Sequence, residues 1–170
     1  MTGAPSGLIP TGDGLDWSTH PPSSYILRHW GRILPDWSGP VQSVIILLQR
    51  APLPRWGRGA PVELAKARLR DRALALGSIL AAALSQQGYQ TAVFDPRTGL
   101  PLATTPGAPL DDVAVAQYLL GYRTEPGGYC TCLLHPRWGG AVYPSTLLST
   151  ALPHQIDGLP LIRTQPTKGE

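Results

Sequence analysis

The longest regular pattern of apolar positions lies between residues 60 and 88. Pro61 suits a first helical turn, Gly88 suits a helix end, and apolar side chains recur between them at three- and four-residue spacings. The repeating positions are Leu69, Ala73, Leu76, Leu80 and Leu84. The pattern predicts a long helix that packs its Leu/Ala stripe on a sheet.

Two shorter segments have helical spacing as well. Residues 25–34 follow two prolines and end before Pro35, which predicts a short amphipathic helix. Residues 110–121 predict another helix, with Asp111 and Asp112 near its positive N-terminal end.

The remaining apolar segments are short and predict strands. The run VQSVIILL at residues 41–48 is nearly continuously apolar and rich in β-branched residues, which is typical of a buried strand. The other predicted strands are residues 89–94, 129–135 and 141–148. A tight loop at residues 135–140 joins the last two, so we expect them to form an antiparallel hairpin. This order of elements indicates an α+β domain with a mostly antiparallel sheet packed by helices.

Composition suggests the domain boundaries. A chain of 170 residues with 42% apolar residues fits one globular domain. The N-terminal segment is rich in Gly, Pro, Ser and Thr, and the C-terminal segment is polar and rich in Pro. We therefore expect a flexible leader at residues 1–20, a single domain at residues 21–152 and a loosely attached tail at residues 153–170.

The net charge of +3 is too small to favour nucleic acid as a partner. Basic residues are locally in excess around the long predicted helix, where Arg68 and Arg72 are four positions apart on the polar side. Such a cluster is typical of a solvated helix face; the alternative is a docking patch for an acidic partner surface or an anionic ligand.

No segment has the roughly 18 to 20 consecutive apolar residues that span a bilayer. The first twenty-seven residues contain neither Lys nor Arg, so the basic start of a signal peptide and an Arg-rich transit peptide are both missing. We expect no membrane span and a cytoplasmic location.

The two cysteines, Cys130 and Cys132, are separated by one residue on a predicted strand. Their side chains should share one face of that strand, but a disulfide across this spacing would be strained, so we expect thiols. A closed zinc site needs four ligands, and this pair with His135 does not supply them. Cys132 is expected to be a buried apolar side chain. Cys130 follows two glycines at the start of the strand, where solvent can reach a nucleophilic thiol.

Two loops offer further candidates. Asp95 and Arg97 lie in the turn FDPRTGLP, which is either a rigid connection or a loop that faces a partner or ligand. Trp138 lies in HPRWGG and is either a core anchor or a flat wall against a planar ligand. The sequence contains no dinucleotide-binding, P-loop or nucleophile-elbow motif, which favours a protein that is not an enzyme.

Several of these motifs, in the same order, resemble the conserved domain of the methylmalonic aciduria and homocystinuria type D family of cobalamin-trafficking proteins. The resemblance rests on QGYQTAVFDPRTGLPL, LDDVAVAQYLLGY and GGYCTCLLHPRWGGAVYPSTL. Residues 22–48 also resemble the helix and strand that precede this domain, so the likeness covers about 125 residues.

The resemblance implies a modified nitroreductase-like α+β fold without flavin. It also implies a non-catalytic adaptor that binds cobalamin transiently and docks with a cobalamin-processing or cobalamin-dependent enzyme. In the animal proteins a cysteine coordinates cobalt, and the matching candidate is Cys130, with Tyr129 and Trp138 as further cofactor contacts. The animal proteins have two adjacent cysteines, and counting back from His135 places Tyr129 at the first and Cys130 at the second. Arg68, Arg72, Asp95 and Arg97 are the candidate partner contacts.

Two alternatives stay open. One is an interaction scaffold or assembly factor with the same fold and no cobalamin, which Tyr129 at the expected ligand position supports. The other is a flavin-dependent reductase of the nitroreductase class, which would require a basic phosphate pocket.

Overall fold

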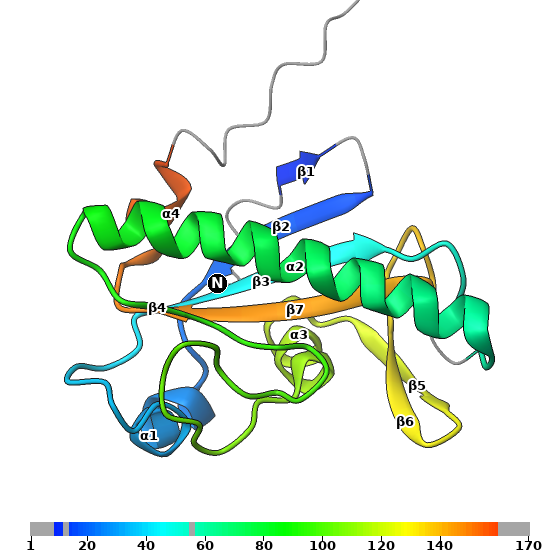
Figure 1. The fold of residues 1–170 in the computed structure, drawn as a ribbon, viewed down its shortest axis with the longest axis horizontal. Helices are drawn as coiled ribbons and strands as arrows, with labels where there is room; N and C mark the ends of the chain where they lie inside the picture. Colours follow the sequence, from blue (N-terminus) through cyan, green and yellow to red (C-terminus); the bar gives the residue numbers. More distant parts are fainter. Residues whose placement is uncertain (1–8, 12–13, 55–56, 160–170) are drawn as a thin grey trace, which may run out of the picture.

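A five-stranded antiparallel sheet runs through the centre of the computed structural model, which describes residues 9–11, 14–54 and 57–159 (Figure 1). Its strands lie in the order β1-β2-β3-β7-β4, and β5 and β6 form a separate antiparallel hairpin. The strands are β1 (Ile9–Thr11), β2 (Leu15–His20), β3 (Ser43–Arg50), β4 (Thr91–Val93), β5 (Arg123–Gly127), β6 (Cys130–Leu134) and β7 (Val142–Ser149). The helices are α1 (Ser24–Ile33), α2 (Ala60–Gln86), α3 (Asp112–Leu120) and α4 (Pro153–Asp157). The predicted α+β class with a mostly antiparallel sheet is confirmed.

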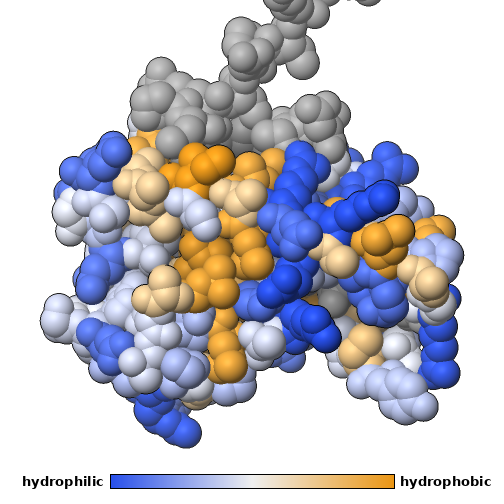
Figure 2. Space-filling model, viewed as in Figure 1, coloured by the Kyte–Doolittle hydropathy of each residue, from blue (hydrophilic) through white to orange (hydrophobic). Residues whose placement is uncertain are grey.

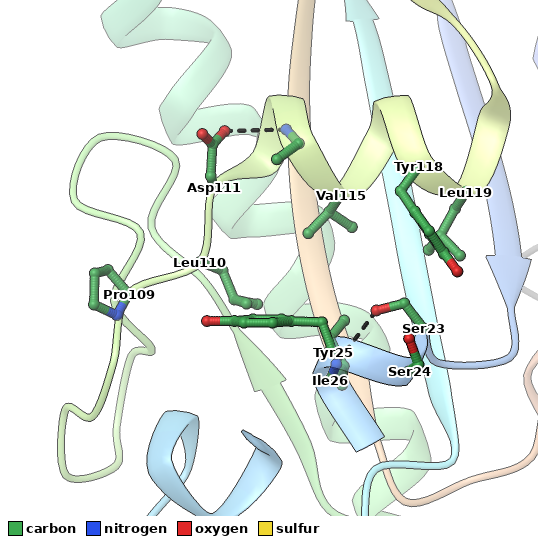
Figure 3. A pocket seen from close by; sticks show the side chains of 11 residues that line it. Ser23, Ser24, Tyr25, Ile26, Pro109, Leu110, Asp111, Val115, Tyr118 and Leu119 are labelled. Carbon is green, nitrogen blue, oxygen red and sulfur yellow. Dashed lines mark hydrogen bonds between the residues drawn. The ribbon is translucent and has the colours of Figure 1, made fainter. Parts of the chain in front are cut away.

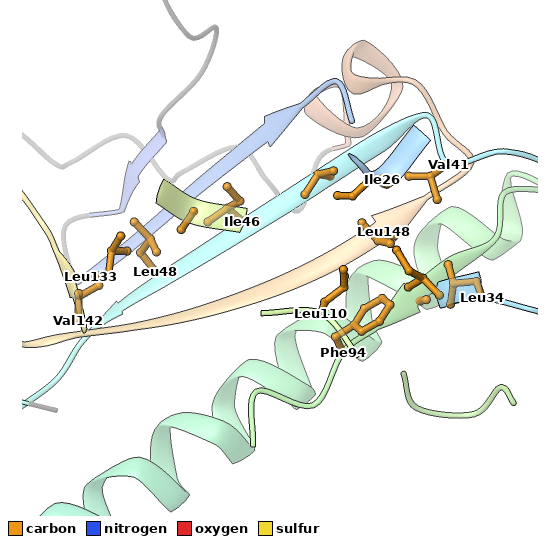
Figure 4. Packing of buried hydrophobic residues seen from close by; sticks show 14 residues of the cluster. Ile26, Leu34, Val41, Ile46, Leu48, Phe94, Leu110, Leu133, Val142 and Leu148 are labelled. Carbon is orange, nitrogen blue, oxygen red and sulfur yellow. The ribbon is translucent and has the colours of Figure 1, made fainter. Parts of the chain in front are cut away.

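Side chains of β3 alternate between two apolar layers. Ile46 and Leu48 face the layer that α1 and α3 cover (Figure 4). Ile45 and Leu47 face the layer that α2 and α4 cover. Because both faces of β3 are buried, the strand is apolar almost throughout although its neighbours run antiparallel to it. The predicted strand at residues 41–48 is therefore confirmed within two residues.

The long helix α2 lies close to the sheet at one point in its middle. A Cβ atom on Gly77 would meet Val93 Cγ1 at 2.8 Å and Leu147 Cδ2 at 3.4 Å. Ala73, Leu80 and Leu84 extend the same buried face along the helix. Glycine at position 77 thus lets α2 pack directly on β4 and β7, as the predicted Leu/Ala stripe required.

The predicted flexible leader at residues 1–20 is wrong for both strands that the structure describes in it, β1 and β2, which pair with each other from Ile9↔Trp17 to Thr11↔Leu15. Leu15–His20 forms β2, which pairs with β3 from Leu15↔Gln49 to His20↔Val44. The strand was missed because four of its six residues are polar, yet Asp16, Ser18, Thr19 and His20 are all buried. Residues 1–8 and 12–13 lie outside the described residues.

Two further expectations are corrected at the C-terminal side. The last two predicted strands do not form a hairpin, because β6 pairs with β5 while β7 pairs with β3 and β4. The predicted tail begins with α4, whose Ile156 is buried, and Leu159 is buried behind it. Residues 160–170 lie outside the described part. Among the helices described, none is long and apolar enough to cross a bilayer.

Candidate functional site

Tyr129 and Cys130 lie at the tip of the β5–β6 hairpin, beside an open cleft of about 520 Å³. The cleft is also lined by the turn at residues 96–99, by the segment that starts α3 and by Pro144 of β7. Two of the candidate residues from distant parts of the sequence, Arg97 and Cys130, therefore share one cleft.

The hairpin turn explains why this tip is exposed. Gly127 pairs with Cys130, so Gly128 and Tyr129 form a two-residue loop, and Gly128 adopts a φ of +74°, which favours glycine. The Tyr129 side chain is 96% exposed. The Arg58 guanidinium carbon lies 5.1 Å from the centroid of the Tyr129 ring, a cation–π contact that brings a positive charge to the tip.

The two cysteine thiols lie side by side on one face of β6. Their Sγ atoms are 3.9 Å apart, and the Cys130 thiol donates to the backbone oxygen of Gly127 at 3.6 Å. Cys130 is exposed and Cys132 is 1% exposed. The shared face, the burial of Cys132 and the accessibility of Cys130 are all confirmed. A soft thiolate ligand can reach solvent only through Cys130.

Asp95 does not line the cleft and instead holds its turn in place. It accepts two hydrogen bonds from Arg70, Nε to Oδ1 at 2.7 Å and Nη2 to Oδ2 at 2.6 Å, and another from the backbone N–H of Arg97. The Arg70 guanidinium holds the pKa of the Asp95 carboxyl below its ordinary value. Gly99, with a φ of +71°, closes the turn by donating to the Asp95 carbonyl. The turn is therefore rigid, and Arg97 is exposed on its outer side.

Trp138 does not line the cleft. Its ring stacks on the His135 imidazole, with centroids 3.8 Å apart and an interplanar angle of 12°, and it packs against the apolar layer under α1 and α3. Of the two interpretations of Trp138, the core anchor fits these contacts. The role of Trp138 as a cofactor contact stays a prediction, because Trp138 does not line the cleft that Cys130 lines.

A buried polar cluster below Trp138 was not predicted. His135 Nε2 lies 2.7 Å from Asp16 Oδ2, and Arg137 Nη2 donates to both Asp16 oxygens at 2.7 and 3.0 Å. His135 Nδ1 accepts from the backbone N–H groups of Arg137 and Trp138. Since Nδ1 accepts, Nε2 carries the proton and donates to Asp16. The alternation of Leu15 and Trp17 with polar residues was the one sequence signal for this strand.

Arg68 and Arg72 are both exposed on α2, and neither lines the cleft. Neither forms a salt bridge with another described residue, whereas Lys66 pairs with Glu63 and Arg70 pairs with Asp95. Figure 2 shows hydrophilic surface over the N-terminal half of α2 beside an apolar band across the middle of the same face. The exposed Ile79 lies on the C-terminal half of this helix.

A second, smaller hollow of about 350 Å³ lies between the first turn of α1 and α3 (Figure 3). Its walls are mainly apolar, and Tyr25 and Tyr118, both largely exposed, form its rim. Ser23 accepts from the Ile26 N–H, and Asp111 accepts from the Val113 and Ala114 N–H groups, so both helix starts are capped internally. No charged group other than Asp111 lines this hollow.

The chain matches no known family model, and comparison with curated proteins finds no relative. The described residues also contain no group of three or more His, Cys, Asp or Glu side chains arranged to hold a metal ion.

Proposed function

We propose that this chain is a non-catalytic, cytoplasmic cobalamin-trafficking adaptor with a modified nitroreductase-like fold, which coordinates cobalt transiently through the Cys130 thiolate. The observation that carries the proposal is the exposed Cys130 thiol beside an open cleft at the tip of a hairpin. An accessible sulfur on a projecting tip is suited to approach a metal held by another molecule.

The cleft is large enough to contact one side of a corrinoid but too small to enclose the whole cofactor. It is open, and a corrinoid is much larger than about 520 Å³. Arg97 lines the same cleft as Cys130 and offers a cation that suits the phosphate of the cobalamin tail, whereas Asp111 and Asp112 line the cleft as well. A partner must then cover the rest of the cofactor, which is the arrangement expected of an adaptor. When bound, the cofactor would supply the cobalt, and Cys130 would supply a sulfur ligand to it.

The exposed cations of α2 support a docking role. Arg68 and Arg72 follow one another on the outer side of the helix, and within the described residues no carboxylate pairs with either. Side chains of this kind steer an acidic surface toward the molecule and fix its orientation. We therefore assign the acidic cobalamin-processing or cobalamin-dependent partner to this side of α2, and Arg97 to the contact at the cleft.

One observation favours a second function, a scaffold without cobalamin. Tyr129 occupies the tip position next to Cys130, is almost fully exposed and carries the Arg58 guanidinium on its ring. An exposed Tyr–Arg pair is typical of a protein-interaction hot spot. A pull-down that returned a large complex with neither a cobalamin enzyme nor a processing partner would favour this function.

Equilibrium dialysis against cob(II)alamin tests the adaptor proposal. We expect the wild-type protein to retain cobalamin above a no-protein control, and Cys130→Ser to retain markedly less. Cys132→Ser is the matched control, because it removes a thiol that solvent does not reach, and it should retain cobalamin like the wild type. Equal retention by wild type and Cys130→Ser would refute the ligand assignment. A charge reversal, Arg68→Glu with Arg72→Glu, should leave retention unchanged while weakening capture of the partner.

A further inference from the structure

The separation of the two sulfurs matches that of two ligands on one metal ion. In a tetrahedral zinc site with Zn–S bonds of about 2.3 Å, two thiolates lie about 3.8 Å apart. The Cys130 and Cys132 Sγ atoms are 3.9 Å apart. An ion could therefore bind both sulfurs with little movement of either side chain.

The strand pairing holds these sulfurs in place. Both cysteines belong to β6, whose register with β5 sets Gly127 opposite Cys130 and Glu125 opposite Cys132. Directly paired residues of an antiparallel pair project to the same face, so Glu125 stands on the face that carries both thiols. A carboxylate on that face favours a cation there. Gly127 has no side chain to cover Cys130, which leaves an approach from solvent.

The ligand type restricts which ions fit. Thiolates select soft and borderline cations such as Cu(I) and Zn(II) over hard ions such as Mg²⁺. The described residues supply no group of three or more metal-ligating side chains here. A bound ion would thus keep coordination positions for water or for a donor from another molecule.

We propose that Cys130 and Cys132 form a bidentate dithiolate site for a thiophilic closed-shell cation. Binding replaces the two thiol protons by one metal ion, so protons are released and the affinity falls as the pH falls. The site does not rest on the proposed cobalamin function, because it needs both sulfurs whereas cobalt ligation needs only Cys130. The two would compete for the Cys130 sulfur.

Zn²⁺ in competition with a chromophoric chelator is the direct test, with the full-length reduced protein. We expect one equivalent of Zn²⁺ per wild-type chain, and Zn²⁺ should protect the exposed Cys130 thiol of the folded protein from a thiol-modifying reagent. Loss of a hydrogen bond to a metal ligand typically lowers metal affinity roughly 10- to 100-fold. Cys130→Ser and Cys132→Ser each remove a ligand itself, so each should lower the Zn²⁺ affinity by more than that.

Cys132 is buried, so Cys132→Ala is measured beside Cys132→Ser, and thermal unfolding of both is compared with that of the wild type. Unchanged zinc affinity in either Cys132 variant, or no stoichiometric zinc binding by the wild type, would overturn the proposal. Zinc binding that fails while cobalamin retention persists rejects the dithiolate site alone. Cobalamin retention that fails while zinc binding persists rejects the adaptor function alone.

Discussion

His135 and Asp16 are joined by a buried hydrogen bond of 2.7 Å across 119 positions of the sequence. His135 directly follows β6, and Asp16 lies on β2. Their hydrogen bond therefore joins the strand that carries the thiols to the central sheet. Arg137 completes the pairing by binding the same carboxylate. The hairpin is therefore attached to the central sheet by a buried polar cluster, in which the Asp16 carboxylate and both ring nitrogens of His135 have hydrogen-bond partners.

The His135–Asp16 pair should make the stability of the folded state sensitive to mild acid. Burial lowers the pKa of His135 below its ordinary value of 6.5, although the hydrogen bond to Asp16 opposes the shift. Because the unfolded chain takes up the proton more readily, the free energy of unfolding should fall as the pH drops below about 6.5 toward the folded-state pKa. Both ring nitrogens are already engaged, so a second proton would break the contacts at Nδ1.

Urea unfolding measured between about pH 7.5 and about pH 5 checks this prediction. His135→Gln should be less stable than the wild type at neutral pH and should show a shallower decline toward pH 5. Burial lowers the pKa of His20 as well, so part of the decline should persist in the variant. A decline that is equally steep in both proteins would contradict the assignment to His135.

The turn beside the cleft should depend on the Asp95–Arg70 pair. Asp95→Asn keeps the shape of the side chain but removes its charge, and hydrogen bonds to charged groups contribute roughly 1.5–3 kcal/mol. We expect a loss of that order in urea unfolding at pH 7. The exposed Asp71, 3.8 Å from the same Arg70, is the matched control, and Asp71→Asn should cost about 1 kcal/mol or less.

The pH dependence of this pair has a different cause from that of His135: the hydrogen bond from Arg70 lowers the pKa of Asp95, whereas burial lowers the pKa of His135. The pKa of Asp95 is lowered in the folded state, so its contribution is complete above the ordinary carboxyl pKa of about 4 and is lost as the pH falls further. The stability difference between wild type and Asp95→Asn should therefore shrink below about pH 4. A difference that is constant down to about pH 2 would show that folding does not lower the pKa of Asp95.

Gly77 should be required for the close approach of α2 to the sheet. Alanine gains about 1 kcal/mol of helix propensity over glycine, but its Cβ would lie 2.8 Å from Val93 Cγ1, and overpacking costs about 1–3 kcal/mol. We expect Gly77→Ala to lower the free energy of unfolding by about 1 kcal/mol. In α1, a Cβ on Gly31 would meet no atom within 4 Å, so Gly31→Ala should be stabilising. Stabilisation by both substitutions would contradict the packing.

Much of the fold could be predicted because its apolar pattern is strong. The buried strand β3 is a nearly continuous apolar run and the long helix α2 keeps one helical period, and both lie within two residues of their predicted bounds. β2 could not be found in this way, since four of its six residues are polar, and the buried Asp16 is paired by His135 and Arg137, which lie far away in sequence. Pairing partners of β6 and β7 were also misjudged, because a tight loop between two strands does not require that they share a sheet.

The candidate site was predicted in part for the same reason. A period of two along β6 was enough to place Cys130 and Cys132 on one face, and the two preceding glycines indicated the exposed turn. The contribution of Arg97 to the cleft depends on the tertiary packing of its turn, so its juxtaposition with Cys130 was not predictable from spacing. Trp138 was undecided until its stacking on His135 was known.

The central claim is that the Cys130 sulfur ligates cobalt, and an absorption titration of reduced cob(II)alamin tests it most directly. Wild type, Cys130→Ser and Cys132→Ser are compared at one pH, with the cobalt spectrum as the readout. We expect a saturable spectral change in the wild type and in Cys132→Ser that is lost in Cys130→Ser. The same spectral change in Cys130→Ser, or none in any of the three proteins, would contradict thiolate ligation by this chain.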